Sequence, residues 1–190
     1  MERGEHMIPI FEQVSGKGQG LGHDDFKKRF KEICEEHLQE KRARIFAFVF
    51  YDMTHDTVRE ALKGAEGFAR LDETSGKDVS LFYLHDRAVE KYWNDFNQRF
   101  LKALKIKGQA ELPCMVVFKF EDGNFVDGMI FPLDYENKDA VTVANDMVHF
   151  LRSAIEVINK EGDVSALAAL PAAAMKLIGL SKFGEYLARM

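Results

Sequence analysis

Residues 45–51 read Ile-Phe-Ala-Phe-Val-Phe-Tyr, an uninterrupted apolar run that decides the fold class. The run is too short for an ordinary helix, and it is rich in aromatic and β-branched side chains. It lacks the polar alternation of a strand that has one face in water, so it predicts a central strand covered on both faces. A strand of this kind belongs to a sheet that lies between layers of helices. The chain is therefore predicted to be an α/β protein.

The flanking sequence supplies helices and further strands. Apolar residues at spacings of three and four predict helices, and short apolar runs predict strands. Upstream, the pattern predicts a short strand at 8–14, a flexible connection rich in glycine at 15–22 and a helix from Asp24 to about residue 41. Downstream, it predicts a helix at 57–71, a loop at 73–77, a second buried strand at 79–84 and a long helix at 89–104.

A hairpin and a capped helix follow. Two apolar runs, 114–120 and 125–131, flank the turn Glu121-Asp-Gly-Asn124. An Asp-Gly step between apolar runs is a strong hairpin signal, so these two strands are predicted to be antiparallel. Asp139 precedes a last long helix and is its predicted N-cap. The resulting order is β-α-β-α-β-α-β-β-α, in which strands separated by helices are expected to pair in parallel through crossovers.

Three segments make up the predicted organisation. Residues 1–23 hold the N-terminal strand and the flexible connection, 7–162 form the main domain, and 163–190 form a C-terminal tail. The tail is rich in Ala and Leu and is interrupted by Pro171 and Gly179, which predicts two or three short helices. These helices are expected to dock on the domain, on a second copy in a homodimer, or on another protein. A membrane surface is disfavoured because the tail has few basic residues.

This order of elements resembles the thioredoxin fold over about residues 7–160. In that family a buried strand leads into the turn and helix that carry the CxxC motif, as the strand at 45–51 leads into a turn here. The family has a cis-proline directly before its fourth strand, where this chain has Leu112-Pro113. A hairpin and a C-terminal helix then follow. The resemblance implies a three-layer sandwich with a mixed sheet, and it implies that the Leu112–Pro113 peptide bond is cis.

The chain departs from the family at the dithiol. The CxxC positions align with Thr54-His55-Asp56-Thr57, which contains no thiol. Dithiol exchange needs one thiolate to attack and a second thiol to resolve the mixed disulfide, and a threonine hydroxyl does neither. The chain thus resembles a thioredoxin-like protein that lacks the CxxC motif and is redox-inactive. Thr54 as a catalytic nucleophile is disfavoured, because His55 is adjacent in sequence and no triad partner is evident.

Two cysteines remain, Cys34 and Cys114. Cys114 follows the predicted cis-proline, so one hypothesis makes it a lone redox-sensing or glutathione-handling thiol. The favoured alternative is a small buried side chain at the start of a strand, as free cysteine usually is. Cys34 is expected to pack on the apolar side of the first helix.

The dipeptide His-Asp occurs twice, at His55-Asp56 and at His85-Asp86. Both copies follow predicted neighbouring strands, and ligands bind where the carboxyl ends of such strands meet. His55 and His85 are therefore candidate metal ligands or acid–base groups, and a binding site is predicted to comprise Thr54, His55, Asp56, His85, Asp86 and Pro113. The favoured alternative is that Asp56 and Asp86 cap helices while the histidines face water.

The charge and apolar content of the chain disfavour two classes of function, nucleic-acid binding and membrane spanning. A net charge of −5 with interspersed cations gives no basic footprint for nucleic acid, and no apolar stretch is long enough to span a bilayer. With no signal-peptide pattern, a cytoplasmic location is expected. No cofactor is predicted. The leading hypothesis is a redox-inactive thioredoxin-like domain that binds other proteins; its rivals are the Cys114 thiol and a metal or acid–base site at the two His-Asp turns.

Overall fold

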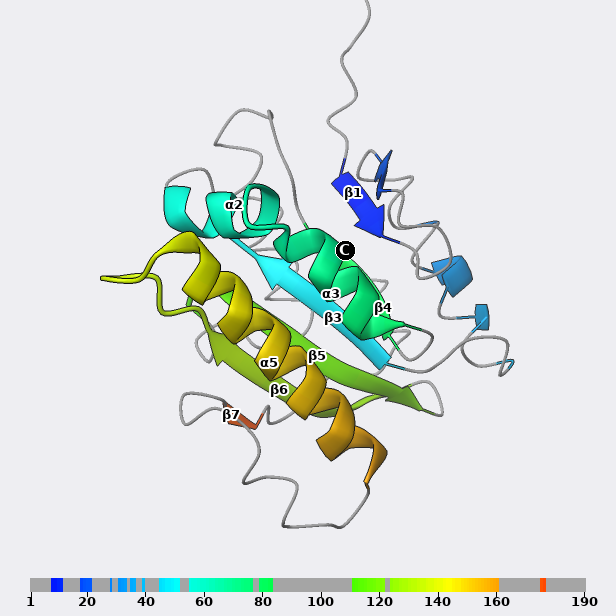
Figure 1. Ribbon diagram of the computed structural model, residues 1–190. Coiled ribbons are helices and arrows are strands. Elements are labelled where there is room, and N and C mark those ends of the chain that lie inside the picture. Colours follow the sequence, from blue (N-terminus) through cyan, green and yellow to red (C-terminus); the bar gives the residue numbers. More distant parts are fainter. Residues whose placement is uncertain are drawn as a thin grey trace, which may run out of the picture.

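The computed structural model describes residues 8–11, 18–21, 28, 31–33, 35–36, 39, 45–51, 55–76, 79–83, 111–121, 124–160 and 175–176. The strands are β1 (Ile8–Phe11), β2 (Gly18–Leu21), β3 (Ile45–Phe50), β4 (Val79–Tyr83), β5 (Cys114–Glu121), β6 (Asn124–Pro132) and β7 (Met175–Lys176). The helices are α2 (Asp56–Lys63), α3 (Gly67–Ser75) and α5 (Ala140–Asn159). Together they form a mixed α/β arrangement, as predicted (Figure 1).

The strands join in one sheet with the order β2-β1-β4-β3-β5-β6-β7. β3 lies in the middle, parallel to β4 on one side and antiparallel to β5 on the other. β5 and β6 form the predicted antiparallel hairpin. The predicted central position of the apolar run at 45–51 is thereby confirmed, because every residue from Ile45 to Tyr51 is buried.

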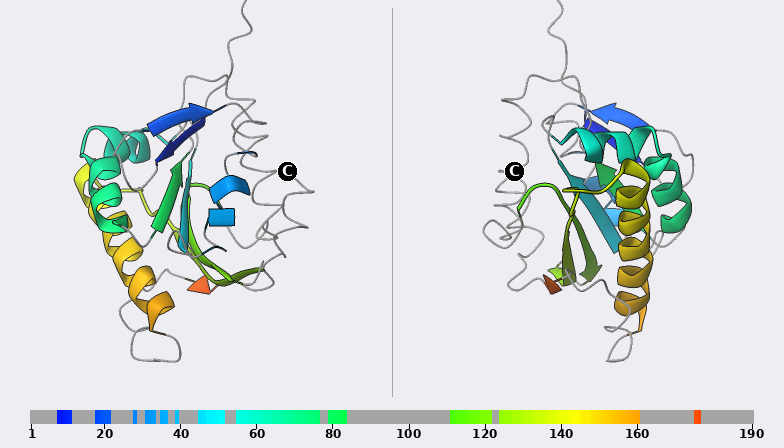
Figure 2. Two further views of the ribbon diagram at one scale, coloured as in Figure 1. Left: turned by 90° about the vertical axis from the view of Figure 1, so that its right-hand side faces the viewer. Right: turned by 60° about the vertical axis from the view of Figure 1, so that its left-hand side comes forward.

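The three helices cover one face of the sheet (Figures 1 and 2). On this face Phe131 of β6 stacks on Phe150 of α5 with 4.9 Å between ring centroids. Phe131 pairs with Met115 of β5, and Met115 pairs with Val49 of β3, so these three side chains lie on the same face of the sheet. Side chains alternate along a strand, so the aliphatic residues of β3 point toward the helices.

The opposite face of the sheet is aromatic. Phe48 of β3 stacks on Phe82 of β4 at 4.8 Å and on Phe118 of β5 at 5.6 Å between ring centroids. The described helical segments at 28, 31–33 and 35–36 lie on this side of the sheet (Figure 2), and Ile33 is buried. Aliphatic side chains are buried on one face of β3 and aromatic side chains on the other. This explains why residues 45–51 show no alternation between apolar and polar side chains.

Two predictions near the N-terminus are wrong. The segment predicted to be a flexible connection contains β2, which pairs antiparallel with β1 from Ile8↔Leu21 to Phe11↔Gly18. Glycine has low strand propensity, but pairing with a neighbouring strand overrides it. β1 also pairs antiparallel with β4, through Ile10↔Phe82, and so departs from the parallel crossover that was expected.

The predicted helix at 57–71 is two helices. α2 ends at Lys63, and α3 begins at Gly67 after Glu66 adopts a left-handed conformation with φ 58°. A Cβ on Gly67 would lie 2.4 Å from the carbonyl oxygen of Ala61, so the two helices approach too closely there for any larger residue. α3 then continues to Ser75, through the start of the predicted loop at 73–77.

The described part of the tail is a strand. Met175 and Lys176 form β7, which pairs antiparallel with Ile130 and Met129 of β6, where short helices were expected. The predicted helix at 89–104, Cys34 and the rest of the tail lie outside the described residues. In the part of the chain that the structure describes, no helix has the length and apolarity that a membrane crossing requires.

Candidate functional site

α2 is the next described element after β3, and His55 is its N-cap residue. The His55 side chain is buried, with 8% of its surface exposed, and it makes no capping hydrogen bond to the helix. Its ring lies edge-on to that of Tyr135, with 5.2 Å between the ring centroids. Tyr135 belongs to the segment between β6 and α5, so this contact joins the end of the hairpin to the start of α2.

Pro113 lies at the same end of the sheet. The Leu112–Pro113 peptide bond is cis, which confirms the prediction. The backbone N–H of Leu133 donates to the carbonyl oxygen of Pro113 at 2.9 Å. The register Phe50↔Cys114↔Pro132 places the last residue of β3 beside the residue that follows Pro113. The end of β3, the cis-proline and the segment after β6 therefore meet in one place.

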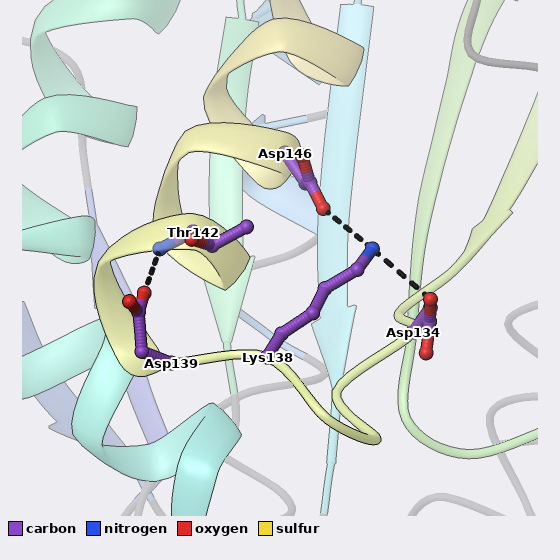
Figure 3. Close-up of polar contacts among 5 residues, drawn as sticks. All are labelled: Asp134, Lys138, Asp139, Thr142 and Asp146. Atoms are coloured by element: carbon purple, nitrogen blue, oxygen red, sulfur yellow. Dashed lines mark hydrogen bonds and ion pairs between the residues drawn. The ribbon is translucent and has the colours of Figure 1, made fainter.

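An ion-pair network holds the segment after β6 against α5. The Lys138 ammonium lies 3.0 Å from a carboxylate oxygen of Asp134 and 3.0 Å from one of Asp146 (Figure 3). The hydrogen bond to Asp146, and secondly that to Asp134, raises the pKa of Lys138 above its ordinary value. Lys138 is thus cationic at neutral pH, and it joins the loop that carries Tyr135 to the first two turns of α5.

Asp139 begins α5 as predicted. Its carboxylate accepts a hydrogen bond of 2.7 Å from the backbone N–H of Thr142 (Figure 3). This bond is the main reason that the pKa of Asp139 lies below its ordinary value. The cap satisfies one of the N–H groups that the first turn of a helix leaves without a partner.

The expected roles of the first His-Asp pair are wrong. Asp56 was expected to cap α2, but it is the first helical residue, and its carboxylate pairs with Arg59 at 2.5 Å. A carboxylate in the first turn still stabilises the helix through its dipole. His55 was expected to face water in the same interpretation, and it is buried instead.

Cys114 is buried completely, with 0% of its surface exposed. Burial away from water raises the pKa of its thiol to about 12. A thiol attacks disulfides and electrophiles as the thiolate, and at pH 7 a pKa near 12 leaves roughly one thiol in 10⁵ ionised. Cys114 thus has the properties of the favoured alternative, a small apolar side chain in the core.

Among the predicted site residues, His55 and Pro113 both contact the segment after β6, His55 through Tyr135 and Pro113 through Leu133, and Asp56 is exposed beside His55. Thr54, His85 and Asp86 lie outside the described residues. Among the residues that are described, no group of three His, Cys, Asp or Glu side chains could hold a metal ion. Tyr135 and Lys138 were not among the predicted site residues. The register of the β5–β6 hairpin could have indicated them. Extending the pairing Cys114↔Pro132 by a few residues places the segment after β6 beside Pro113.

These contacts define a compact site at the carboxyl end of β3, formed by His55, Pro113 and Tyr135 and bordered by exposed acidic residues. Its described residues provide shape and charge but no accessible thiol. No protein-family model, curated protein or solved structure matches the chain.

Proposed function

We propose that this chain is a redox-inactive thioredoxin-like domain that binds other proteins through the surface around His55, Pro113 and Tyr135. The observation that supports the proposal most is the position and packing of His55. A buried imidazole packed on Tyr135 lies at the N-terminus of α2, at the same end of the sheet as the cis-proline, and it occupies the position that follows the first cysteine of a thioredoxin in the alignment of Thr54-His55-Asp56-Thr57 with CxxC.

The arrangement of the central strands supports the resemblance. β3 and β4 are parallel and joined through α2 and α3, and the β5–β6 hairpin adds antiparallel to β3 before α5 follows. This is the order and direction that the resemblance implies for the second half of the fold. The β1–β2 hairpin differs, because β1 runs antiparallel to β4.

The state of the cysteine argues against the thiol alternative. A glutathione-handling or redox-sensing residue needs an accessible thiolate. Cys114 is buried, its pKa is raised to about 12, and it lies within a strand that pairs on both sides. The side chain of a strand residue points toward one face of the sheet, so exposing the sulfur of Cys114 would require the buried packing on that face to open.

The polar border of the site suits a protein partner. Asp56 and Asp134 expose 77% and 62% of their side chains, and Glu136 and Asp139 are also exposed. The Lys138 ion pairs fix the loop that carries three of these carboxylates, so a partner meets a surface that is already ordered. Arg59 and Lys138 pair with two of these carboxylates, so the acidic charge at Glu136 and Asp139 is what favours partners that present basic side chains.

A photo-crosslinking experiment with the full chain tests this proposal. A crosslinker at Asp56 or Glu136 should capture the same partner, and Glu136→Arg should abolish the capture. Glu156→Arg is the matched control, because it reverses an exposed carboxylate on α5 and should leave the capture intact. Equal loss with both substitutions, or capture from α5 alone, would place the binding surface elsewhere.

A further inference from the structure

Residues 134–138 lie in the connection from β6 to α5, between two fixed points. On one side the backbone N–H of Leu133 donates to the carbonyl oxygen of Pro113 at 2.9 Å. On the other side the carboxylate of Asp139 accepts from the first turn of α5. Three of the five residues between these points are exposed, so the segment runs along the surface of the domain.

Few contacts hold this segment down. In the part of the chain that the structure describes, its polar contact to the rest of the domain is the ion pair of Lys138 with Asp146 at 3.0 Å. Its ring contact is that of Tyr135 with His55, and Tyr135 also packs partly against the core. The ion pair of Lys138 with Asp134 stays within the segment. We propose that the segment is a strap over His55, which the Lys138 ammonium holds closed and which opens when this charge is removed or screened.

The charge of the strap favours opening once the ammonium is lost. Asp134, Glu136 and Asp139 are acidic, and Lys138 is the one cation in residues 133–139. Carboxylate oxygens of Asp134 and Asp146 each lie 3.0 Å from the Lys138 nitrogen, so the two carboxylates face each other across it. Like charges this close repel each other when no cation lies between them. Loss of the ammonium therefore replaces an attraction between the strap and α5 by a repulsion.

The backbone of the strap also favours release. Asn137 has φ 60°, in the left-handed region that residues other than glycine rarely adopt. A conformation of this kind persists where the surrounding contacts fix it. Lys138 is the next residue, and its ion pairs supply such contacts. Segments held by few contacts open locally far more readily than the whole domain unfolds.

The strap would regulate the surface proposed above, and this link rests on the proposed function. Tyr135 and Glu136 belong to the strap, so its opening withdraws them from a partner. The same movement uncovers one side of His55, which is 8% exposed when the strap is closed. Removing the charge of Lys138 should therefore weaken partner binding while it makes the imidazole more accessible.

Labelling of His55 by diethyl pyrocarbonate, mapped by peptide mass spectrometry, tests the strap in the full chain without a partner. Lys138→Met removes the charge and keeps an unbranched side chain. It should raise the rate of His55 labelling about threefold to tenfold, as the loss of two partly exposed ion pairs allows. Lys138→Arg keeps the charge and should stay near the parent. Lys160→Met, at the other end of α5, is the matched control, and the exposed His149 should label equally in every chain.

Salt gives a second test that needs no variant. An ionic strength of about 1 M shortens the Debye length to about 3 Å, so it should speed His55 labelling in the unsubstituted chain. Unchanged labelling in folded Lys138→Met would overturn the strap, and so would an equal rise in Lys160→Met. If Lys138→Met does not fold, a His55 rate that does not respond to salt would overturn it. Faster labelling in Lys138→Met with undiminished partner capture at Glu136 would support the strap and contradict the proposed binding surface.

Discussion

The ring of Tyr135 lies edge-on against the buried ring of His55, at 5.2 Å between centroids. The two residues are 80 positions apart in the sequence, and the contact joins the end of the β5–β6 hairpin to the start of α2. This contact lies at the centre of the candidate site. The segment that carries Tyr135 is held to Pro113 at its start, through Leu133, and to α5 near its end, through the Lys138 ion pairs.

This contact should have a measurable coupling energy. Aromatic pairs contribute about 0.5–1.5 kcal/mol beyond the area that they bury. A double-mutant cycle with His55→Ala and Tyr135→Ala, measured by chemical denaturation, is therefore expected to give a coupling near 1 kcal/mol. Tyr135→Phe keeps the ring and should retain the coupling. A value indistinguishable from zero would mean that the rings do not stabilise each other.

Cys114 should be unreactive in the native state. In a Cys34→Ser background it is the only thiol, and its burial and raised pKa predict very slow reaction with a disulfide reagent at pH 7. Addition of denaturant should make the reaction fast and stoichiometric. Rapid native-state labelling would instead revive the lone-thiol alternative.

Gly67 and Gly64 should respond differently to alanine. A Cβ on Gly67 meets the backbone of α2, whereas a Cβ on Gly64 meets mainly the flexible side chain of Glu60. Gly67→Ala is expected to lower the free energy of unfolding by about 1–3 kcal/mol, as overpacking does. Gly64→Ala should stay within about 1 kcal/mol of the parent, since helix propensity favours alanine. The reverse order would contradict the close approach of α2 and α3.

Asp139 should make stability depend on acidity. Its folded-state pKa lies below the ordinary 3.8, so its stabilisation is complete above that pH and is lost as the pH falls through the depressed pKa. Asp139→Ala should lower the denaturation midpoint at neutral pH, and its deficit should shrink in acid. Asp139→Asn, which also caps, should stay near the parent at neutral pH. A deficit for alanine that does not change with pH would exclude the charged cap as its cause.

Much of the sheet and of α5 follows from local sequence. The apolar run of β3, the Asp-Gly turn between β5 and β6 and the Asp139 cap each have a short-range cause, and each predicted element is present. The break between α2 and α3 was missed, because it depends on Glu66 in a left-handed conformation and on the approach of Gly67 to Ala61. Both are properties of the packed helices.

The candidate site was predicted only in part for a similar reason. His55 and Pro113 were expected near the carboxyl end of β3, and they lie there. Tyr135 and Lys138 come from the segment after β6, whose position depends on how the hairpin pairs with β3. β2 and β7 were missed because both exist through pairing with a neighbour, and neither has the apolar alternation of an independent strand.

The most direct test of the central claim is an insulin-reduction assay with dithiothreitol as the electron source. The unsubstituted chain should not exceed the uncatalysed rate, because its described thiol is buried and Thr54 and Thr57 occupy the positions of the dithiol. Thr54→Cys combined with Thr57→Cys should form a disulfide and gain activity, since the proposed fold then holds both thiols at the start of α2. An active unsubstituted chain that loses turnover on Cys114→Ser would contradict the redox-inactive assignment. A double variant that forms no disulfide and stays inactive would contradict the thioredoxin-like assignment itself.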